Sequence, residues 1–529
     1  MLQCIAPCSP PPFLVRARPL RLPVMRRSLL LAVVLVTSTA CTTLSNTARS
    51  YLTAPNGLQI DDDRVRSLLQ RGMADSAFRA MGNRNSPLSP DDRLLRLLYQ
   101  GSAARYAGRY REAGGLFDQA FAVSEDRYTK SLGRTTAALV TNDFALPYTA
   151  GRNERLLLHY NALLSWSAAG DADAAAVEGR RLVALLASVG EPDADERAMR
   201  ATMHALAAAA FEQAGDWNDA AVARRNAIRL GAPLDTAWSA PTDSMGDLLV
   251  VIERGDIAHK VAVGLTIPIF SGDNLDASSG EFTAQRFLGD LGALRNGGIW
   301  YDDAPSWRFT DTRYGPLRGQ RASYLLDMSW PVLRRAPALG AGNVRVGVAL
   351  RTTEEAAPLS ASLSDALVSD YRRDRSAILA RTVTRAVTKY LAVRAFEAAA
   401  VAATEAAAKK DDGDEAKSKK KKKKDDHGAK TVGMVARIFA NAATTALERA
   451  DTRAWTLLPG NVTLVRMRIP AGSHEVLVDA AGMRQLSLPV VSVRAGRTTI
   501  VSARLWRETG QGFRAVVERA ESRHAPPQR

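Results

Sequence analysis

Cysteine is scarce in this chain of 529 residues, which contains only Cys4, Cys8 and Cys41. Because none follows residue 41, the rest of the chain can form no disulfide framework, no CxxC redox pair and no cysteine-ligated zinc site. The six histidines make neither an HxH nor an HExxH spacing. A Walker A loop and a GxSxG elbow are also absent from the sequence. We therefore expect no metal site and no cofactor.

Aromatic residues and long apolar runs are few as well. Aromatics make up 6% of the chain and charged residues 24%, while hydrophobic residues reach 46%, which is close to an average globular composition. This composition excludes a mostly disordered chain and a polytopic membrane protein, and the length predicts several domains. The net charge is +16, but the basic residues are spread along the chain and are not striped with aromatics. Together with the export signal below, this predicts no nucleic-acid partner and favours anionic envelope components.

An export signal is predicted at residues 25–40. Met25-Arg26-Arg27 is basic, Leu29 to Val36 is an apolar run too short to span a bilayer, and small residues then lead to Cys41. The pattern resembles a bacterial lipoprotein signal, which implies cleavage before Cys41 and lipidation of that residue, palmitate included. The alternative is an ordinary secretory signal with a chance cysteine.

The residues around this signal give further expectations. Residues 1–24 are rich in Pro and Arg, and we interpret them as an upstream extension with Met25 as the true start. Residues 41–60 are polar and predict a flexible tether. An Asp after the cysteine would resemble an inner-membrane retention signal, and Thr42 stands there instead. We therefore expect a lipid anchor in the outer membrane, with the protein facing the periplasm.

Residues 61–235 predict nearly continuous amphipathic helix. Gly101, Gly108, Tyr110 and Phe117 have spacings that resemble a tetratricopeptide repeat (TPR), in which small residues let two antiparallel helices approach and an aromatic fills the gap. Weaker copies follow around Gly170 and around Gly215, about 62 and then 45 residues further on. We interpret this region as an irregular TPR-like domain; an unspecialised helical bundle is the alternative.

The rest of the chain predicts an α+β multidomain protein. Residues 242–351 alternate like strands and predict a β-rich or mixed domain with a long loop. Residues 363–450 predict long helices joined by a lysine-rich linker at 409–430, which we interpret as solvated, with contact to anionic groups as the alternative. Residues 451–506 predict four short strands of a small β-sandwich, and residues 507–529 a polar tail. The sandwich resembles PEGA-type modules through the turn Pro470-Ala-Gly472-Ser-His474.

Several phrases together resemble an uncharacterised family of bacterial outer-membrane lipoproteins with TPR-like repeats. They are Asn153-Glu154-Arg155, His159 to Leu163, Gly170-Asp171, Ala176 to Glu178, Arg180-Arg181, Asp451 to Trp455, Leu458-Pro459, Arg466 and Ile469 to His474. The family looks like a companion of curli-secretion-channel-like lipoproteins. The resemblance implies a role in envelope assembly and supplies no reaction. It implies an envelope protein partner, such as another outer-membrane lipoprotein or a secretion channel.

Two groups of residues are candidates for binding a protein partner. The first is Tyr106, Tyr110 and Tyr160, which we expect to line the concave surface of the helical repeat. The second is Glu178, Arg180 and Arg181, which lie on one helix. These three favour an ion pair that sets helix register, with a clamp for a peptide carboxylate as the alternative. Further along, Asp451, Arg453 and Trp455 predict an ion pair and a packed Trp where helix meets β-module.

An aromatic loop supplies the competing hypothesis. Trp300, Asp302, Asp303 and Trp307 lie close together, and paired carboxylates beside aromatics suit a glycan-modifying enzyme. The same loop could stack sugars without catalysis. On balance the sequence favours a non-enzymatic, lipid-anchored scaffold that binds protein partners in envelope assembly or secretion.

Overall fold

The computed structural model describes residues 57–82, 92–131, 147–270, 322–335, 344–348, 358–410, 450–480, 486–508 and 512–517. The chain divides into two compact units, Met1–Pro55 and Asn56–Arg529, and every described residue belongs to the second. The predicted signal, Cys41, most of the tether, most of the lysine-rich linker and most of the tail therefore lie outside the described residues.

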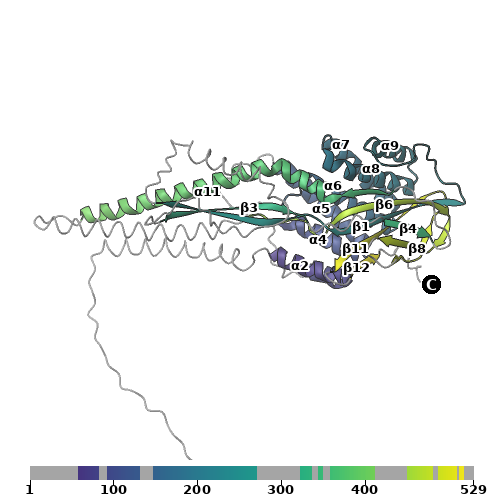
Figure 1. The fold of residues 1–529 in the computed structure, drawn as a ribbon, viewed down its shortest axis with the longest axis horizontal. Coiled ribbons are helices and arrows are strands. Elements are labelled where there is room, and N and C mark those ends of the chain that lie inside the picture. Colours follow the sequence, from purple (N-terminus) through teal and green to yellow (C-terminus); the bar gives the residue numbers. More distant parts are fainter. Residues whose placement is uncertain are drawn as a thin grey trace, which may run out of the picture. The chain divides into compact units, whose positions relative to one another are not determined.

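Among the described residues of the first half, eight helices form four consecutive helical hairpins. Each helix packs on the next (Figure 1). The hairpins are α2 (Gly57–Gln70) with α3 (Ala74–Gly82), α4 (Arg93–Tyr106) with α5 (Tyr110–Ser131), α6 (Arg152–Ala168) with α7 (Ala172–Ser188), and α8 (Ala194–Ala214) with α9 (Trp217–Arg229). The predicted helical N-terminal region is confirmed.

The hairpins turn on glycine and pack through small residues. Gly72, Gly108, Gly170 and Gly215 have φ of 74°, 76°, 75° and 92°, a region that side chains with a Cβ rarely adopt. Inside the second hairpin, a Cβ on Gly101 would lie 2.8 Å from the ring of Phe117. The small-residue spacing seen in the sequence therefore marks a real helix–helix contact.

A five-stranded sheet joins the middle of the chain to its C-terminal part. Its order is β12-β11-β1-β6-β5, and the strands are β12 (Gly512–Val517), β11 (Thr498–Glu508), β1 (Met245–Asp256), β6 (Pro459–Pro470) and β5 (Leu359–Ser362). β1 pairs with β11 in parallel and with β6 in antiparallel fashion. The predicted C-terminal strands are confirmed. Their assignment to a unit separate from residues 242–351 was wrong, because β1 is buried on both faces and lies inside the same sheet.

The sheet is the middle of three layers. Leu248, Val250 and Ile252 on one face of β1 pack in a core with two small sheets, whereas Leu249 and Val251 on the other face join the helical core. One small sheet is β4 (Val344–Val348), β8 (Val476–Ala480) and β9 (Leu486–Ser487), and the other is β7 (Gly472–His474) with β10 (Val491–Val493). The C-terminal strands thus form a sandwich that β1 and β4 complete.

Helix α11 (Leu363–Lys410) follows β5 directly and spans 48 residues, about 72 Å of helix. It lies beside an antiparallel ribbon of β2 (His259–Phe270) and β3 (Ala322–Arg334) (Figure 1). Trp330, Tyr390 and Val393 are buried in the core between ribbon and helix. In the part of the chain that the structure describes, no helix combines the length and apolarity that a membrane span requires.

Replacing Gly101 with Ala is expected to destabilise the protein by about 1–3 kcal/mol, since the new methyl group would overlap the ring of Phe117. The matched control is Gly115→Ala in α5, where an added Cβ meets nothing within 4 Å. Helix propensity alone should make that variant more stable by up to about 1 kcal/mol. Urea unfolding measures both, and equal effects at the two positions would contradict a close α4–α5 contact.

Candidate functional site

The three predicted partner-binding tyrosines are buried. Tyr106, Tyr110 and Tyr160 are 4%, 1% and 0% exposed. Tyr160 donates its hydroxyl hydrogen bond to Glu253 Oε1 at 2.7 Å, and Tyr106 donates to Glu253 Oε2 at 3.4 Å. Glu253 belongs to β1, so the chain's own sheet covers the surface on which Tyr106 and Tyr160 lie. The prediction that these side chains line an open groove was wrong for that reason.

A buried ion pair lies at the centre of this contact. Arg105 Nη1 in α4 is 3.0 Å from Glu253 Oε1, and the two side chains are 1% and 0% exposed. Arg105 also donates to Asn161 Oδ1 at 2.8 Å and to Ser502 Oγ at 3.3 Å. Burial and the neighbouring Glu253 carboxylate raise the pKa of Tyr160 well above 10.0, so its hydroxyl remains a donor. These buried side chains link α4, α6, β1 and β11, which is a structural role.

A second buried acid stands at the other end of β1. Asp247 is 1% exposed and accepts from Arg466 Nη2 at 2.7 Å, from Arg468 Nε at 2.8 Å and from Trp238 Nε1 at 3.0 Å. Burial alone would raise the pKa of Asp247, but these bonds to Arg468 and Arg466 lower it below 3.8. Arg466 also pairs with Glu212 of α8, which is fully buried. Sequence reasoning missed Asp247 and Glu253, because the arginines that pair with them lie far away along the chain.

The predicted cluster on α7 divides into buried and exposed parts. Glu178 is 2% exposed and contacts His159 Nδ1 at 2.7 Å and Arg181 Nη1 at 2.5 Å. Arg181 reaches Asp118 of α5 at 2.8 Å, and burial, with Glu178 nearby, raises the pKa of Asp118. The expected ion pair within one helical turn is confirmed. Since Glu178 is buried and Arg181 already holds two acids, neither is free to clamp a peptide carboxylate.

Arg180 is different because its side chain is 49% exposed. Its Nε lies 3.1 Å from Asp219, and its Nη2 contacts Asp216, the residue that precedes α9. Val177 on the same helix is 43% exposed, and Val222 on α9 is 45% exposed. We call Val177, Arg180 and Val222 the outer surface. It combines apolar and charged groups on the second helices of two neighbouring hairpins.

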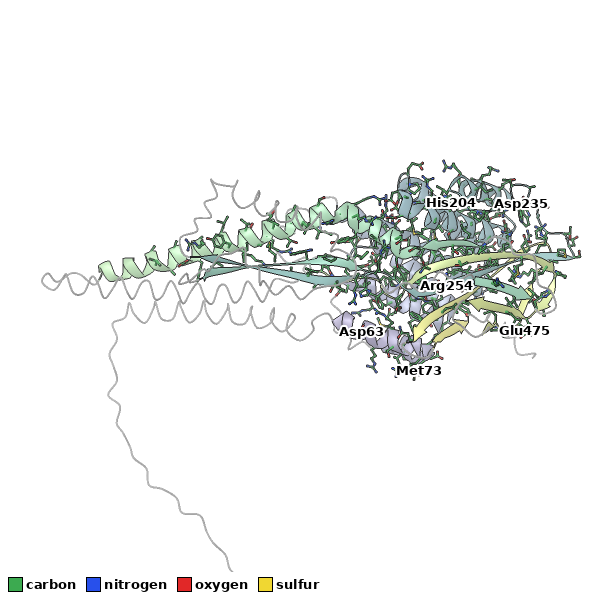
Figure 2. The ribbon with its side chains drawn as sticks, in the orientation of Figure 1. Asp63, Met73, His204, Asp235, Arg254 and Glu475 are labelled. Atoms are coloured by element: carbon green, nitrogen blue, oxygen red, sulfur yellow. The ribbon has the colours of Figure 1, made fainter. Side chains whose placement is uncertain are left out.

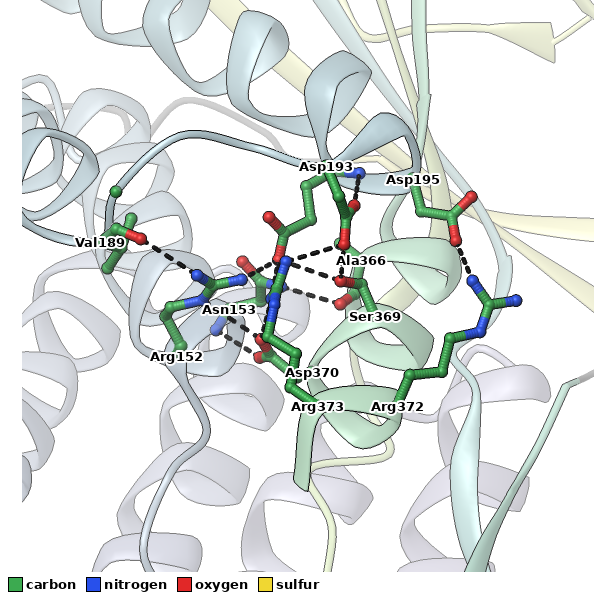
Figure 3. Close-up of polar contacts among 12 residues, drawn as sticks. Arg152, Asn153, Val189, Asp193, Asp195, Ala366, Ser369, Asp370, Arg372 and Arg373 are labelled. Carbon is green, nitrogen blue, oxygen red and sulfur yellow. Dashed lines mark hydrogen bonds and ion pairs between the residues drawn. The ribbon is translucent and has the colours of Figure 1, made fainter. Parts of the chain in front are cut away.

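An extended polar group joins α11 to the helical hairpins (Figure 3). Glu196 of α8 is fully buried and is contacted by Arg152, Arg200 and Arg373. Asp370 of α11 accepts from the backbone N–H of Asn153 at 2.7 Å. The sequence predicted helices on both sides of this junction but not their contact.

The other predicted site residues lie outside the described residues. These are Cys41 and the loop residues Trp300, Asp302, Asp303 and Trp307. Lipidation and glycan contact therefore stay predictions. Among the residues that are described, no three His, Cys, Asp or Glu side chains gather where they could hold a metal ion.

Comparison with known proteins assigns this chain to no family. No family model matches the chain, and no curated protein matches it. Among solved structures, one titled "MamA RS-1 ArsTM double mutant" is similar to part of the chain, with 15% sequence identity and a TM-score of 0.24. That match covers 34% of this chain and 78% of the other. Its TM-score is too low to support any argument about fold or function.

Replacing Glu253 with Gln is expected to destabilise the protein by about 3–5 kcal/mol, because the buried charge of Arg105 would lose the carboxylate of Glu253 that lies 3.0 Å from it. The double variant Arg105→Met, Glu253→Gln removes that charge and should recover part of the loss. Urea unfolding of wild type, both single variants and the double variant measures the coupling. Strictly additive losses would show that the two side chains do not act as a pair.

His204 gives a pH prediction. It lies in α8 (Figure 2), and burial, with Arg229 and Arg200 nearby, lowers its pKa from 6.5 to about 4. As the pH falls below 6.5, the imidazole of His204 is protonated in the unfolded chain but stays neutral in the folded protein. His204 should therefore reduce the free energy of unfolding by about 2 kcal/mol between pH 7 and pH 5. In His204→Gln this contribution disappears. Urea unfolding at both pH values tests it, and an unchanged pH dependence would contradict it.

Proposed function

We propose that this protein is a non-enzymatic scaffold that a lipid on Cys41 anchors in the outer membrane, facing the periplasm. Its partner is an envelope protein, such as another lipoprotein or a component of a secretion channel. The basic, apolar and small-residue pattern before Cys41 supports the anchor. The stacked helical hairpins support the binding role, because such stacks present extended surfaces without catalytic groups.

The hairpins support a TPR-like interpretation in two ways. Each turns on a glycine with positive φ, and each helix packs mainly on its neighbours in sequence. In α4–α5 and α7–α8, glycines lie against aromatic rings, as at Gly101 with Phe117 and Gly179 with Phe211. Small residues facing an aromatic are what a TPR-like helix pair needs.

The partner surface we propose is the outer surface, since the chain's own sheet covers the surface of the hairpins on which Tyr106 and Tyr160 lie. The helices that open the hairpins supply the contacts to the sheet, as Arg105 of α4 and Tyr160 of α6 do with Glu253. The second helices, α7 and α9, carry the exposed side chains of Val177 and Val222. Val177 lies one helical turn before Arg180, and Val222 lies one turn after Asp219, the ion-pair partner of Arg180. This exposed mixture of apolar and charged side chains is the observation that carries the proposal, because binding surfaces combine apolar area with arginine.

The test is an affinity purification of the full-length protein from detergent-solubilised envelopes, with mass spectrometry of what co-purifies. In the variant Val177→Asp, Val222→Asp we expect loss of an envelope protein that wild type retains, by at least about tenfold, since new charges oppose burial of this surface. Both valines are exposed, so the variant should fold.

Met73→Asp is the matched control, because Met73 is 47% exposed and lies between α2 and α3. It should leave the complex intact. Cys41→Ser tests the anchor separately and should release the protein from the membrane fraction. Recovery of the same proteins with wild type and with the Val177→Asp, Val222→Asp variant would overturn the proposed partner surface.

A further inference from the structure

Helix α11 docks on the hairpins through its first three turns. It begins directly after edge strand β5, and Leu363, Ala366 and Val368 are buried in the helical core. The next residues, Ser369 to Arg373, meet the N-terminal ends of α6 and α8 (Figure 3). This junction joins the first turns of the long helix to the hairpins.

Asp370 is the residue at which α11 and α6 meet. Its side chain is 14% exposed, and its Oδ2 accepts the backbone N–H of Asn153 at 2.7 Å. Arg152 Nε donates to Oδ1 at 3.3 Å. Since Asn153 lies in the first turn of α6, where backbone N–H groups have no partner within the helix, Asp370 caps α6 from another element.

The charges around Asp370 come from three elements. The α6 side contributes Arg152 and Glu154, the α8 side contributes Asp193, Glu196 and Arg200, and α11 itself contributes Arg373. Three arginines, Arg152, Arg200 and Arg373, contact the fully buried Glu196.

These arginines neutralise the charge of Glu196 more than that of Asp370. Arg373 Nη1 lies 2.7 Å from Glu196 and 3.4 Å from Asp370, so the negative charge of Asp370 is the less neutralised of the two. Ser369, the residue before Asp370, shares its hydroxyl hydrogen between Asp193 and Glu196, so both acids belong to this junction. The junction therefore holds a partly buried carboxylate near other carboxylates.

We propose that proton uptake by Asp370 tightens the docking of α11 on α6 and α8, so that the junction is firmer in mild acid than at neutral pH. A protonated carboxyl keeps a carbonyl oxygen to accept from Asn153 N–H and no longer repels Glu196 and Glu154. The proposal does not depend on the function proposed above.

The direction follows from linkage. Burial, with Glu196 and Glu154 nearby, raises the pKa of Asp370 from 3.8 to about 6, although Asn153 and Arg152 oppose the rise. When α11 separates from α6, Asp370 is hydrated and its pKa returns toward 3.8. The docked state therefore binds the proton more tightly, and docking gains about tenfold between pH 7 and pH 5.

Hydrogen exchange of the α11 backbone amides 366–373 in the full-length protein tests this, after correction for intrinsic exchange rates. We expect wild-type protection to rise about tenfold from pH 7 to pH 5. In Asp370→Asn, which keeps the acceptor for Asn153 N–H and carries no charge, protection should already be high at pH 7 and should not change. Amides of β1 report global opening and separate it from opening of the junction.

Asp195→Asn is the matched control, because Asp195 pairs with Arg372 in the same junction but is 36% exposed. In this variant, the protection of amides 366–373 should still rise about tenfold from pH 7 to pH 5. Asp370→Ala removes the acceptor and should reduce protection at both pH values. A full pH response in Asp370→Asn, or weaker protection in it than in wild type at pH 7, would overturn the proposal, as would a wild-type junction whose protection does not change.

Discussion

Strand β1 is apolar on both faces, and its burial organises the rest of the structure. One face needs cover from the helices and the other from the small sheets, so β1 can only lie inside a layered assembly. On the helical face, the acids Asp247 and Glu253 flank Leu249 and Val251. Each acid is buried and finds arginines on other elements, Arg466 and Arg468 on β6 and Arg105 on α4. Apolar burial holds the layers together, and these buried ion pairs join β1 to α4 and β6.

Elements with strong local patterns could be predicted from the sequence. The helical hairpins were, because small residues and glycines repeat at turns such as Gly108 and Gly170. The ion pair and the packed Trp at residues 451–455 were too: Arg453 pairs with Asp451 at 2.7 Å, and Trp455 is fully buried with its Nε1 donating to Ser102. The helix expected before them lies outside the described residues. In each case the partners are near in sequence or the residue type leaves few choices.

Long-range pairing could not be predicted. The local sequence from Leu248 to Ile252 does not indicate that β1 pairs with β6 and β11, which lie more than two hundred residues later in the chain. That pairing is also why the expected groove is absent at Tyr106 and Tyr160. The sheet packs on the face of the helices where the groove was expected and buries both side chains. Arg180 stayed exposed since α7 belongs to the other side of its hairpin.

The position of β1 has a consequence for how the chain folds. Each hairpin of helices can form from neighbouring residues, soon after it is made. The sheet cannot, because both neighbours of β1 lie beyond residue 458. Until they arrive, the apolar strand has two unpaired edges, the condition under which chains associate with one another. A chain shortened from its C-terminus into β11 would leave one edge of β1 permanently open, so aggregation is a greater hazard for such a fragment than loss of its helices.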